Sequence, residues 1–246
     1  MIRRIVYVLA LLCLATTTAS ATMGAKRFDF VWNVKASHPL AFFRFESPSG
    51  ASVVGTTTYK ATGGVSTETG APIGVDGNRA LLFDGTDGYV DTTLQGGITT
   101  KASMMAWVDL AVAPSGVGHI DYVAGESQSG NDLDVQFESD NRLHFYTAAG
   151  SNLSFSPDAT TLVNKWHMIV VTLDIGTGAR AIYWDGKVVA TDNGGGNANK
   201  TTEFSVGESK VFTGRYFDGG IDEVALWNRA LSASEVAAIY ASTRAK

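Results

Sequence analysis

One stretch of the sequence places oxygen-bearing side chains at alternating positions. Asp132, Asp134, Gln136 and Glu138 stand two residues apart, so in a β-strand their side chains would line one face. Two carboxylates on such a face could serve as the acid and the nucleophile of a glycosidase, which lie about 5–5.5 Å apart in a retaining enzyme. The same alternation is typical of the solvent-exposed side of a half-buried strand. We favour this second interpretation and assign no catalytic residue.

Other common catalytic centres have no counterpart in the chain. The sequence has no Gly-x-Ser-x-Gly motif, and its single cysteine, Cys13, lies in an apolar N-terminal segment. The histidines lack the spacing of zinc ligands; they are His38, His119, His144 and His167. Any side chains that bind a ligand must therefore be positioned by the strands that the rest of the sequence predicts.

Short runs of alternating apolar residues recur about every ten residues from Ala80 onward. Turn-forming residues separate these runs, and few segments have helical periodicity, which is typical of an all-β sandwich. Predicted strands cover residues 40–46, 80–83, 89–93, 103–110, 120–124, 133–137, 143–147, 152–155, 167–173, 181–184, 187–191, 203–206 and 220–227.

The C-terminal segment predicts a last strand followed by a short closing helix. Residues 221–227 alternate as a strand does, and the period changes after them. Ser232 and Glu235 have the spacing of a capping box, and Leu231 and Val236 have the spacing of a hydrophobic staple. We therefore predict a helix over residues 233–240.

The N-terminus has the three parts of a secretory signal peptide. Two arginines precede an apolar run, residues 5–15, and residues 19–21 have the small-residue pattern of a cleavage site. The apolar run is shorter than the roughly 20 residues that a membrane-spanning helix needs. We predict a signal peptide at residues 1–21 and a mature protein that is secreted or otherwise extracytoplasmic, in the periplasm or outside the cell, without membrane insertion.

The remaining chain divides into a lead-in, residues 22–37, and one domain, residues 38–246. Phe28, Phe30 and Trp32 alternate, which allows an edge strand or a hydrophobic latch, but we expect a partly ordered arm. Residues 47–77 are rich in Gly, Ser and Thr and indicate an irregular loop with at most one short strand. The net charge of −5 provides no basic surface, so we predict no nucleic-acid partner.

Six segments resemble, in the expected order, those of the laminin-G-like, concanavalin A-like jelly-roll domains. The last is the pattern G-x-I-D-E-V-x-x-[YW]-N-R-A-L-S-x-x-E-[VI]-x-x-[IL]-Y, which Gly219–Tyr240 matches. The others are PLAFFRFE, FDGTDGYV, ASMMAWV, WHMIVVTLD and IYWDGKVVA, at residues 39–46, 83–90, 102–108, 166–174 and 182–190. The resemblance implies a two-sheet antiparallel β-sandwich, a concanavalin A-like jelly roll with a short C-terminal helix. This fold carries many functions.

The resemblance also implies a candidate structural calcium site. Calcium takes roughly six to eight oxygen ligands, and in such domains the first and last strands are neighbours, which would bring Glu46, Asp87 and Asp222 together. Asp222 stands in an apolar strand, where a carboxylate needs a partner. The alternative is that Asp222 accepts hydrogen bonds from the turn at residues 85–87, without a metal. Gly88 departs from the family pattern, which usually has a second aspartate there.

Three functions are compatible with this resemblance. We predict first a non-catalytic module of the lectin or adhesion type, which binds a glycan or a cell-surface protein. A structural module of an envelope or appendage is the alternative, and a glycoside hydrolase is third, because residues 132–138 depart from the E-x-D-x-E pattern of related glucanases. Trp184 is the candidate sugar-stacking residue, since similar domains carry a small aliphatic residue there. A polar row with exposed aromatics on a sheet face would favour binding, whereas a flat apolar face would favour assembly.

Overall fold

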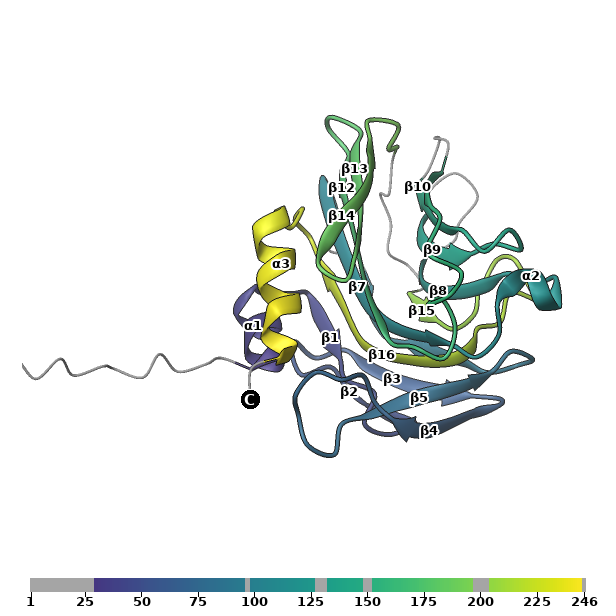
Figure 1. Cartoon of the computed structure of the whole chain (residues 1–246). Helices are drawn as coiled ribbons and strands as arrows, with labels where there is room; N and C mark the ends of the chain where they lie inside the picture. Colours follow the sequence, from purple (N-terminus) through teal and green to yellow (C-terminus); the bar gives the residue numbers. More distant parts are fainter. Residues whose placement is uncertain (1–28, 96–97, 127–131, 148–151, 197–203, 245–246) are drawn as a thin grey trace, which may run out of the picture.

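A computed structural model describes residues 29–95, 98–126, 132–147, 152–196 and 204–244. The predicted signal peptide, residues 1–21, lies outside the described residues. Within these residues the chain forms two antiparallel sheets, A and B, packed face to face, with the helices of residues 30–36 and 233–241 on one side (Figure 1). The predicted all-β sandwich with a C-terminal helix is therefore confirmed. None of the helices in these ranges is long and apolar enough to cross a membrane.

Sheet A has the strand order β14-β13-β12-β7-β16-β5-β4, with β1 paired to β16. Its strands are β1 (Ala41–Phe43), β4 (Val65–Thr69), β5 (Arg79–Asp84), β7 (Lys101–Leu110), β12 (His167–Asp174), β13 (Ala179–Trp184), β14 (Lys187–Asp192) and β16 (Asp218–Trp227). The first strand lies beside the last, as predicted, because Phe42 and Ala225 are partners in the ladder.

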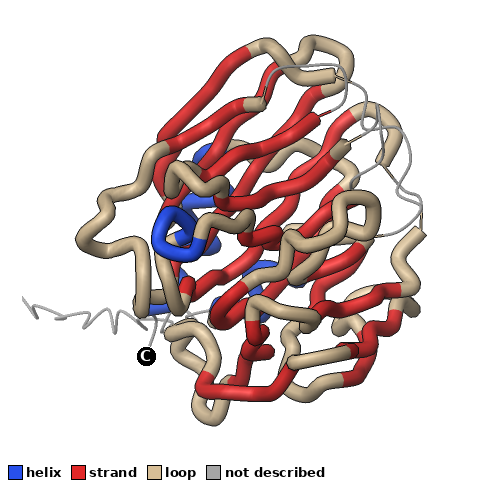
Figure 2. Tube along the Cα trace, turned by 90° about the vertical axis from the view of Figure 1, so that its right-hand side faces the viewer, coloured by secondary structure: helices blue, strands red, loops and turns tan. Residues whose placement is uncertain are grey.

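Sheet B has the strand order β11-β10-β9-β8-β15-β6-β3-β2. Its strands are β2 (Ser49–Ala51), β3 (Thr58–Thr62), β6 (Tyr89–Thr92), β8 (Asp121–Glu126), β9 (Leu133–Phe137), β10 (Leu143–Thr147), β11 (Leu153–Phe155) and β15 (Ser205–Val206). Figure 2 views the molecule from the side of this sheet and shows the strands running next to one another. The helices are α1 (Phe30–Ala36), α2 (Pro114–Val117), α3 (Ala233–Ala241) and the 3-10 turn η1 (Ser242–Arg244).

The main hydrophobic core lies between the two sheets. Alternate residues of β9 and β10, such as Val135 and Phe145, are buried there with Phe43, Phe83 and Ile182 of sheet A. Because successive strand residues point to opposite sides, the residues between them on β9 and β10 face away from this core. Those residues form the outer face of sheet B.

The outer face of sheet A is covered by α1, α3 and the loop of residues 70–78, which form a second core. Phe30 of α1 is fully buried and packs edge to face on Phe42 and Trp107. The predicted partly ordered arm, and the alternative of an edge strand, are therefore wrong over the described part of residues 22–37, whereas the alternative of a hydrophobic latch matches the buried Phe30. Asp29 caps helix α1 there by accepting from the Trp32 N–H. The apolar side of this helix is buried in the second core.

The prediction of an irregular loop at residues 47–77 is also wrong. Three strands, β2, β3 and β4, occupy this region. β2 and β4 are edge strands, and most residues of the three are exposed or half-buried, so their Ser- and Thr-rich sequences carry little apolar alternation. Edge position explains why the sequence pattern did not reveal them.

Helix α3 begins with the predicted capping box. The Ser232 hydroxyl accepts from the Glu235 N–H at 3.3 Å, and the Glu235 carboxylate accepts from the Ser232 N–H at 2.8 Å. Leu231 and Val236 are both buried in the second core, as the staple predicts. The helix lies across the outer face of sheet A rather than only along its edge (Figure 1).

Loss of this cap should weaken the fold measurably. Replacing Ser232 with alanine is expected to destabilise the domain by about 1 kcal/mol, because it removes the hydrogen bonds to the first turn of α3. Urea denaturation followed by tryptophan fluorescence measures this difference. Ser234→Ala, at the second residue of α3, serves as the matched control and should change stability less; equal losses would contradict the assigned cap.

Candidate functional site

The structure does not bring the three predicted calcium ligands together. Asp222 is fully buried, and its Oδ2 accepts from the Ala71 N–H at 3.0 Å and from Asn78 Nδ2 at 2.7 Å. Its Oδ1 accepts from the Glu223 N–H at 2.8 Å. The loop of residues 70–78 therefore supplies both partners of Oδ2, and the alternative prediction, in which the turn at residues 85–87 did so, is wrong as well.

Glu46 and Asp87 have separate partners. Glu46 pairs with Arg44 at 2.7 Å, whereas Asp87 Oδ1 accepts from the Gly64 N–H at 2.6 Å. Gly64, the partner of Asp87, precedes β4, and Ala71, a partner of Asp222, follows it. Asp87 and Asp222 therefore lie at opposite ends of β4, about 20 Å apart. No group of three or more His, Cys, Asp or Glu in the described ranges could hold a metal ion. Glu46, Asp87 and Asp222 therefore do not form the predicted calcium site.

A buried charge cluster stands where β16 changes its neighbour from β5 to β1. The Arg44 Nε donates to Glu223 Oε1 at 3.0 Å, and the Arg44 Nη2 donates to Asn78 Oδ1 at 2.7 Å. Glu223 is fully buried with φ of 53°, at a bulge in the ladder, and its Oε2 has no hydrogen-bond partner in the described structure. Burial and the charge of Asp222 raise the pKa of Glu223, against the effect of Arg44. Burial raises the pKa of Asp222 to about 7.

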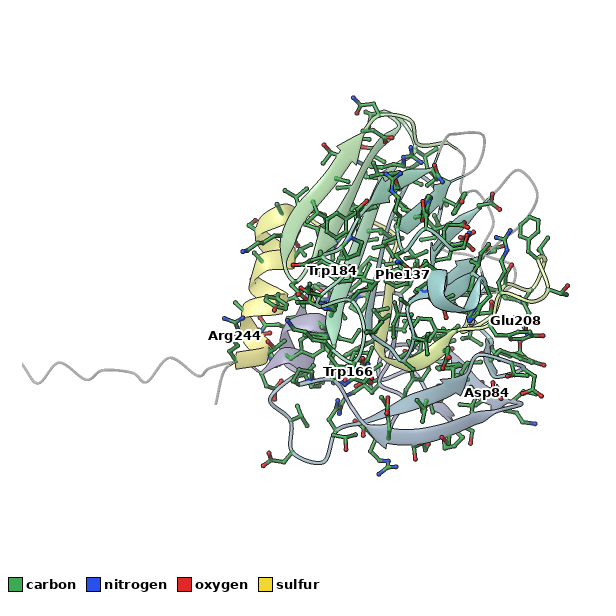
Figure 3. All side chains as sticks on the ribbon, turned by 45° about the vertical axis from the view of Figure 1, so that its right-hand side comes forward. Asp84, Phe137, Trp166, Trp184, Glu208 and Arg244 are labelled. Atoms are coloured by element: carbon green, nitrogen blue, oxygen red, sulfur yellow. The ribbon has the colours of Figure 1, made fainter. Side chains whose placement is uncertain are left out.

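Trp184 does not present its ring as a sugar platform. The indole packs edge to face on Phe137 of the main core, with ring centroids 6.3 Å apart, and against His167 at 4.4 Å (Figure 3). Phe155 of β11 lies against it as well, at 5.7 Å. Trp184 therefore helps to close the sandwich between sheets A and B. The prediction that it stacks on a sugar is wrong, because its ring packs against core residues.

His167 forms a histidine–aspartate pair that resembles part of a catalytic triad. Its Nδ1 lies 2.8 Å from Asp185 Oδ2, but its Nε2 lies 2.8 Å from the Thr161 carbonyl oxygen. A general base needs its second ring nitrogen directed at a nucleophile. Here a backbone carbonyl occupies that position, so the pair fastens the β13–β14 hairpin to β12 and has no catalytic arrangement.

The outer face of sheet B carries a row of polar side chains. Tyr122, Gln136, His144 and Ser154 are successive partners across β8, β9, β10 and β11. Their neighbours along β9 and β10 are core residues, so all four belong to the opposite face. We call this set the polar row, together with Glu138, Tyr146, Asn152 and Arg215, which contact it, and Phe212, which contacts Arg215.

Hydrogen bonds join the members of the polar row across the strands. Glu138 Oε1 accepts from Gln136 Nε2 at 2.7 Å and from the Tyr146 hydroxyl at 2.8 Å. Asn152 Nδ2 donates to the Tyr146 oxygen at 3.2 Å and also contacts His144 Nδ1. Burial, with the Glu138 hydrogen bond, raises the pKa of Tyr146, so its hydroxyl stays protonated. The network fixes these groups in one orientation.

The loop of residues 207–216 adds an aromatic ring and a cation to the row. Phe212 is 42% exposed, and the Arg215 guanidinium lies over its ring at 4.4 Å. The Arg215 Nη1 donates to Gln136 Oε1 at 3.0 Å, which anchors the loop to β9. Sequence reasoning missed both residues; the available signal was an apolar pair, Val211 and Phe212, within a turn-rich segment.

The polar row combines exposed and buried groups in a way that suits a hydroxyl-rich ligand. Gln136 and His144 are buried and hold the arrangement, while Glu138, Tyr146 and Asn152 remain partly exposed. The stacked rings of His144 and Tyr146, 5.9 Å apart, give the row a rigid base. The arrangement can offer hydrogen-bond donors, acceptors and an aromatic face to one ligand, which is the composition of sugar sites.

Solved structures with the same fold include several binding domains. The receptor binding domain of botulinum neurotoxin C/D mosaic serotype matches with a TM-score of 0.66 at 11% identity, over 83% of this chain and 51% of that one. A structure of botulinum neurotoxin type C, whose cell entry depends upon two ganglioside molecules, matches at 0.63 and 14% identity, over 84% and 51%. The chain thus spans about half the length of these neurotoxin domains.

An arabinanase domain matches over nearly its whole length. Domain 4 of AbnA, a GH43 extracellular arabinanase from Geobacillus stearothermophilus, in complex with arabinotriose, gives a TM-score of 0.61 at 16% identity, over 81% of this chain and 97% of that one. At such identities these likenesses show the fold. No curated protein sequence matches the chain. The profile of one family, Laminin_G_3, matches residues 84–237, and the chain belongs to this family of the concanavalin A-like lectin/glucanases superfamily.

Proposed function

We propose that this protein is a non-catalytic glycan-binding module whose site is the polar row on the outer face of sheet B. The observation that carries the proposal is the continuous network from Gln136 through Glu138 and Tyr146 to Asn152, with the exposed Phe212 at one end. Sugars are recognised by polar groups that fix their hydroxyls and by aromatic rings that cover their C–H faces. A flat apolar face, which the alternative of a structural module expects, is not what these strands present.

The binding domains with the same fold support this proposal by analogy. One was solved with arabinotriose, and another belongs to a toxin that uses gangliosides. Because this fold hosts many functions, the argument depends on the polar row and not on the likeness. The predicted signal peptide at residues 1–21 fits the same proposal, since a glycan or cell-surface partner would be met outside the cytoplasm.

Hydrolysis is the less favoured function because the strand lacks a suitable pair of carboxyl groups. Between Asp134 and Glu138, the residue facing the same side is Gln136, whose amide cannot donate or accept a proton as an acid–base catalyst. Glu138 Oε1 accepts from Gln136 and Tyr146, and Asp134 is buried. A retaining glycosidase needs an acid and a nucleophile that both reach the scissile bond.

A glycan array tests the proposal with the mature domain, residues 22–246. Phe212→Ala should weaken binding about 10-fold, because it removes the stacking surface at the end of the row. Trp32→Ala is the matched control: Trp32 is 45% exposed but lies on α1, over the other sheet, so binding should stay unchanged. Signals with and without EDTA are expected to agree, because no group of acidic side chains in the described ranges suits calcium.

Two results would contradict the proposal. Sustained hydrolysis of a β-glucan that disappears in Glu138→Gln would identify a catalytic strand where we infer a binding surface. A folded domain that binds no glycan on the array, and instead forms ordered assemblies, would favour the structural module. Circular dichroism of each variant separates loss of binding from loss of folding.

A further inference from the structure

Some arginines of the described residues form an ion pair with a carboxylate and others do not. Arg44, Arg180 and Arg229 each form an ion pair with a carboxylate, at 3.0, 2.6 and 2.7 Å. Arg142 and Arg215, which contact the outer face of sheet B, donate instead to neutral oxygens. Neither forms an ion pair with any described residue. Arg79, whose side chain donates to Thr67, and Arg244, which lies over Tyr240, are of the second kind but do not contact the outer face of sheet B.

Arg215 is held rigidly although no carboxylate holds it. Its guanidinium lies 4.4 Å from the centre of the Phe212 ring and donates through Nη1 to Gln136, whose side chain is buried. An arginine carries five N–H donors in a planar fork that matches carboxylate, sulfate and phosphate oxygens. Stacking and one hydrogen bond leave most of that fork available, so an incoming anion would pay little for ordering the side chain.

Arg142 stands at the other end of the same row. Its guanidinium donates to the Ser154 hydroxyl, and Ser154 is two strands from Gln136, the partner of Arg215. Two strand spacings separate these anchoring residues by about 10 Å. Both guanidinium groups can therefore face one extended ligand lying across β9, β10 and β11.

Glu138 and Asp140 on this face do not neutralise the two arginines. Glu138 Oε1 accepts from two neutral donors, Gln136 and Tyr146. Asp140 Oδ1 accepts the backbone N–H of Arg142 at 2.9 Å, which fixes the β9–β10 turn, and lies 3.7 Å from His144 Nε2. Glu138 and Asp140 thus have defined local roles, and neither forms an ion pair with Arg142 or Arg215.

We propose that the polar row prefers glycans in which an anionic group, a carboxylate or a sulfate, accompanies a sugar ring stacked on Phe212. This inference rests on the proposed glycan-binding function and names its ligand class. The ring would cover the exposed part of Phe212, and the anion would accept a pair of hydrogen bonds from Arg215. Arg142 would bind a second polar or anionic group one sugar further along. Charge-assisted hydrogen bonds of this kind are roughly twice as strong as neutral ones.

The test compares ligands that share one neutral core. Lactose, sialyllactose and sulfated lactose, together with galactan and polygalacturonate, are titrated into the mature domain by calorimetry or by competition on the array. At low salt we expect the anionic ligands to bind at least about 10-fold more tightly than their neutral partners. This difference in affinity should shrink as the salt concentration rises. Sialyllactose and sulfated lactose distinguish a carboxylate source from a sulfate source.

Substitutions assign the effect to the two arginines. Arg215→Gln should bring the anionic ligands to within about 2-fold of the neutral ones, and Arg215→Lys should restore part of the preference, because a lysine keeps the charge but not the planar fork. Arg244→Gln is the matched control, since Arg244 lies over Tyr240 on the helix side of the molecule, away from Glu208 and the loop that follows it (Figure 3). Arg142→Gln should reduce binding of longer anionic ligands more than that of short ones.

Each outcome separates this inference from the function on which it rests. Equal binding of neutral and anionic ligands, lost in Phe212→Ala, would overturn the preference and leave the glycan-binding module standing. A preference that survives Arg215→Gln would overturn the assignment of the anion site. Absence of binding to every neutral and anionic glycan would overturn both. Melting curves of the arginine variants show that each one is folded before it is compared.

Discussion

Replacing Arg44 with methionine is expected to destabilise the domain by about 3–5 kcal/mol near neutral pH. Arg44 is the cation paired with the fully buried Glu223, whose Oε2 already lacks a hydrogen-bond partner in the described structure. Methionine replaces the apolar stem of the side chain but removes the charged guanidinium, which leaves Glu223 and Asp222 as two adjacent buried acids without a counter-ion. Urea denaturation measures the loss.

The same cluster makes stability depend on pH. Burial raises the pKa of Asp222 to about 7 and that of Glu223 above its usual range. The pKa of a carboxyl group in the unfolded chain is about 4. Between these values the folded state binds more protons than the unfolded state, so stability is greatest below about pH 4 for this contribution and falls as pH rises through about 7. The buried Asp121, whose pKa burial also raises to about 7, acts in the same direction.

Three variants assign this pH dependence to its residues. Glu223→Gln should flatten the decline in stability between pH 5 and pH 8, and Asp121→Asn should remove a further part of it. Arg44→Met should steepen it, because the unpaired acids then resist ionisation more strongly. Arg79→Met is the control, since the Arg79 side chain is exposed and donates to the neutral Thr67 hydroxyl; its backbone N–H, which donates to Glu46, is unchanged by the substitution. Arg44→Met and Arg79→Met with equal stability would show that the buried pair carries no net stabilisation.

Replacing Phe30 with alanine should cost about 3–5 kcal/mol of unfolding free energy, the range for large buried aromatic residues. Its ring is fully buried against Phe42 and Trp107 and holds α1 on sheet A. Trp32→Ala, in the same helix but 45% exposed, is the control and should cost less than about 1 kcal/mol. Thermal unfolding monitors both. A small loss in both variants would favour a partly ordered arm at this segment over a helix docked on sheet A.

The sequence alone determined the arrangement of the strands along the chain. Periods of two in residues 133–137, 143–147 and 167–173 produced strands with nearly the predicted bounds, because hydrophobic alternation reflects one face turned to a core. The capping box of Ser232 and Glu235 was readable because its geometry is local, within four residues. Local patterns did not predict the edge strands β2 and β4, which lack a regular apolar face. They also did not predict helix α1 in the lead-in.

The tertiary structure decided which side chains form the site. Alternation could place Gln136 and Glu138 on one face, but β13 is buried on both faces, so its sequence could not show that Trp184 points into the main core. Arg215 reaches Gln136 from 79 positions away, and Asp222 meets Asn78 from 144 away. Such pairs depend on which strands become neighbours and where long loops return. These long-range contacts are set by packing the whole chain, and no local pattern of residues contains them.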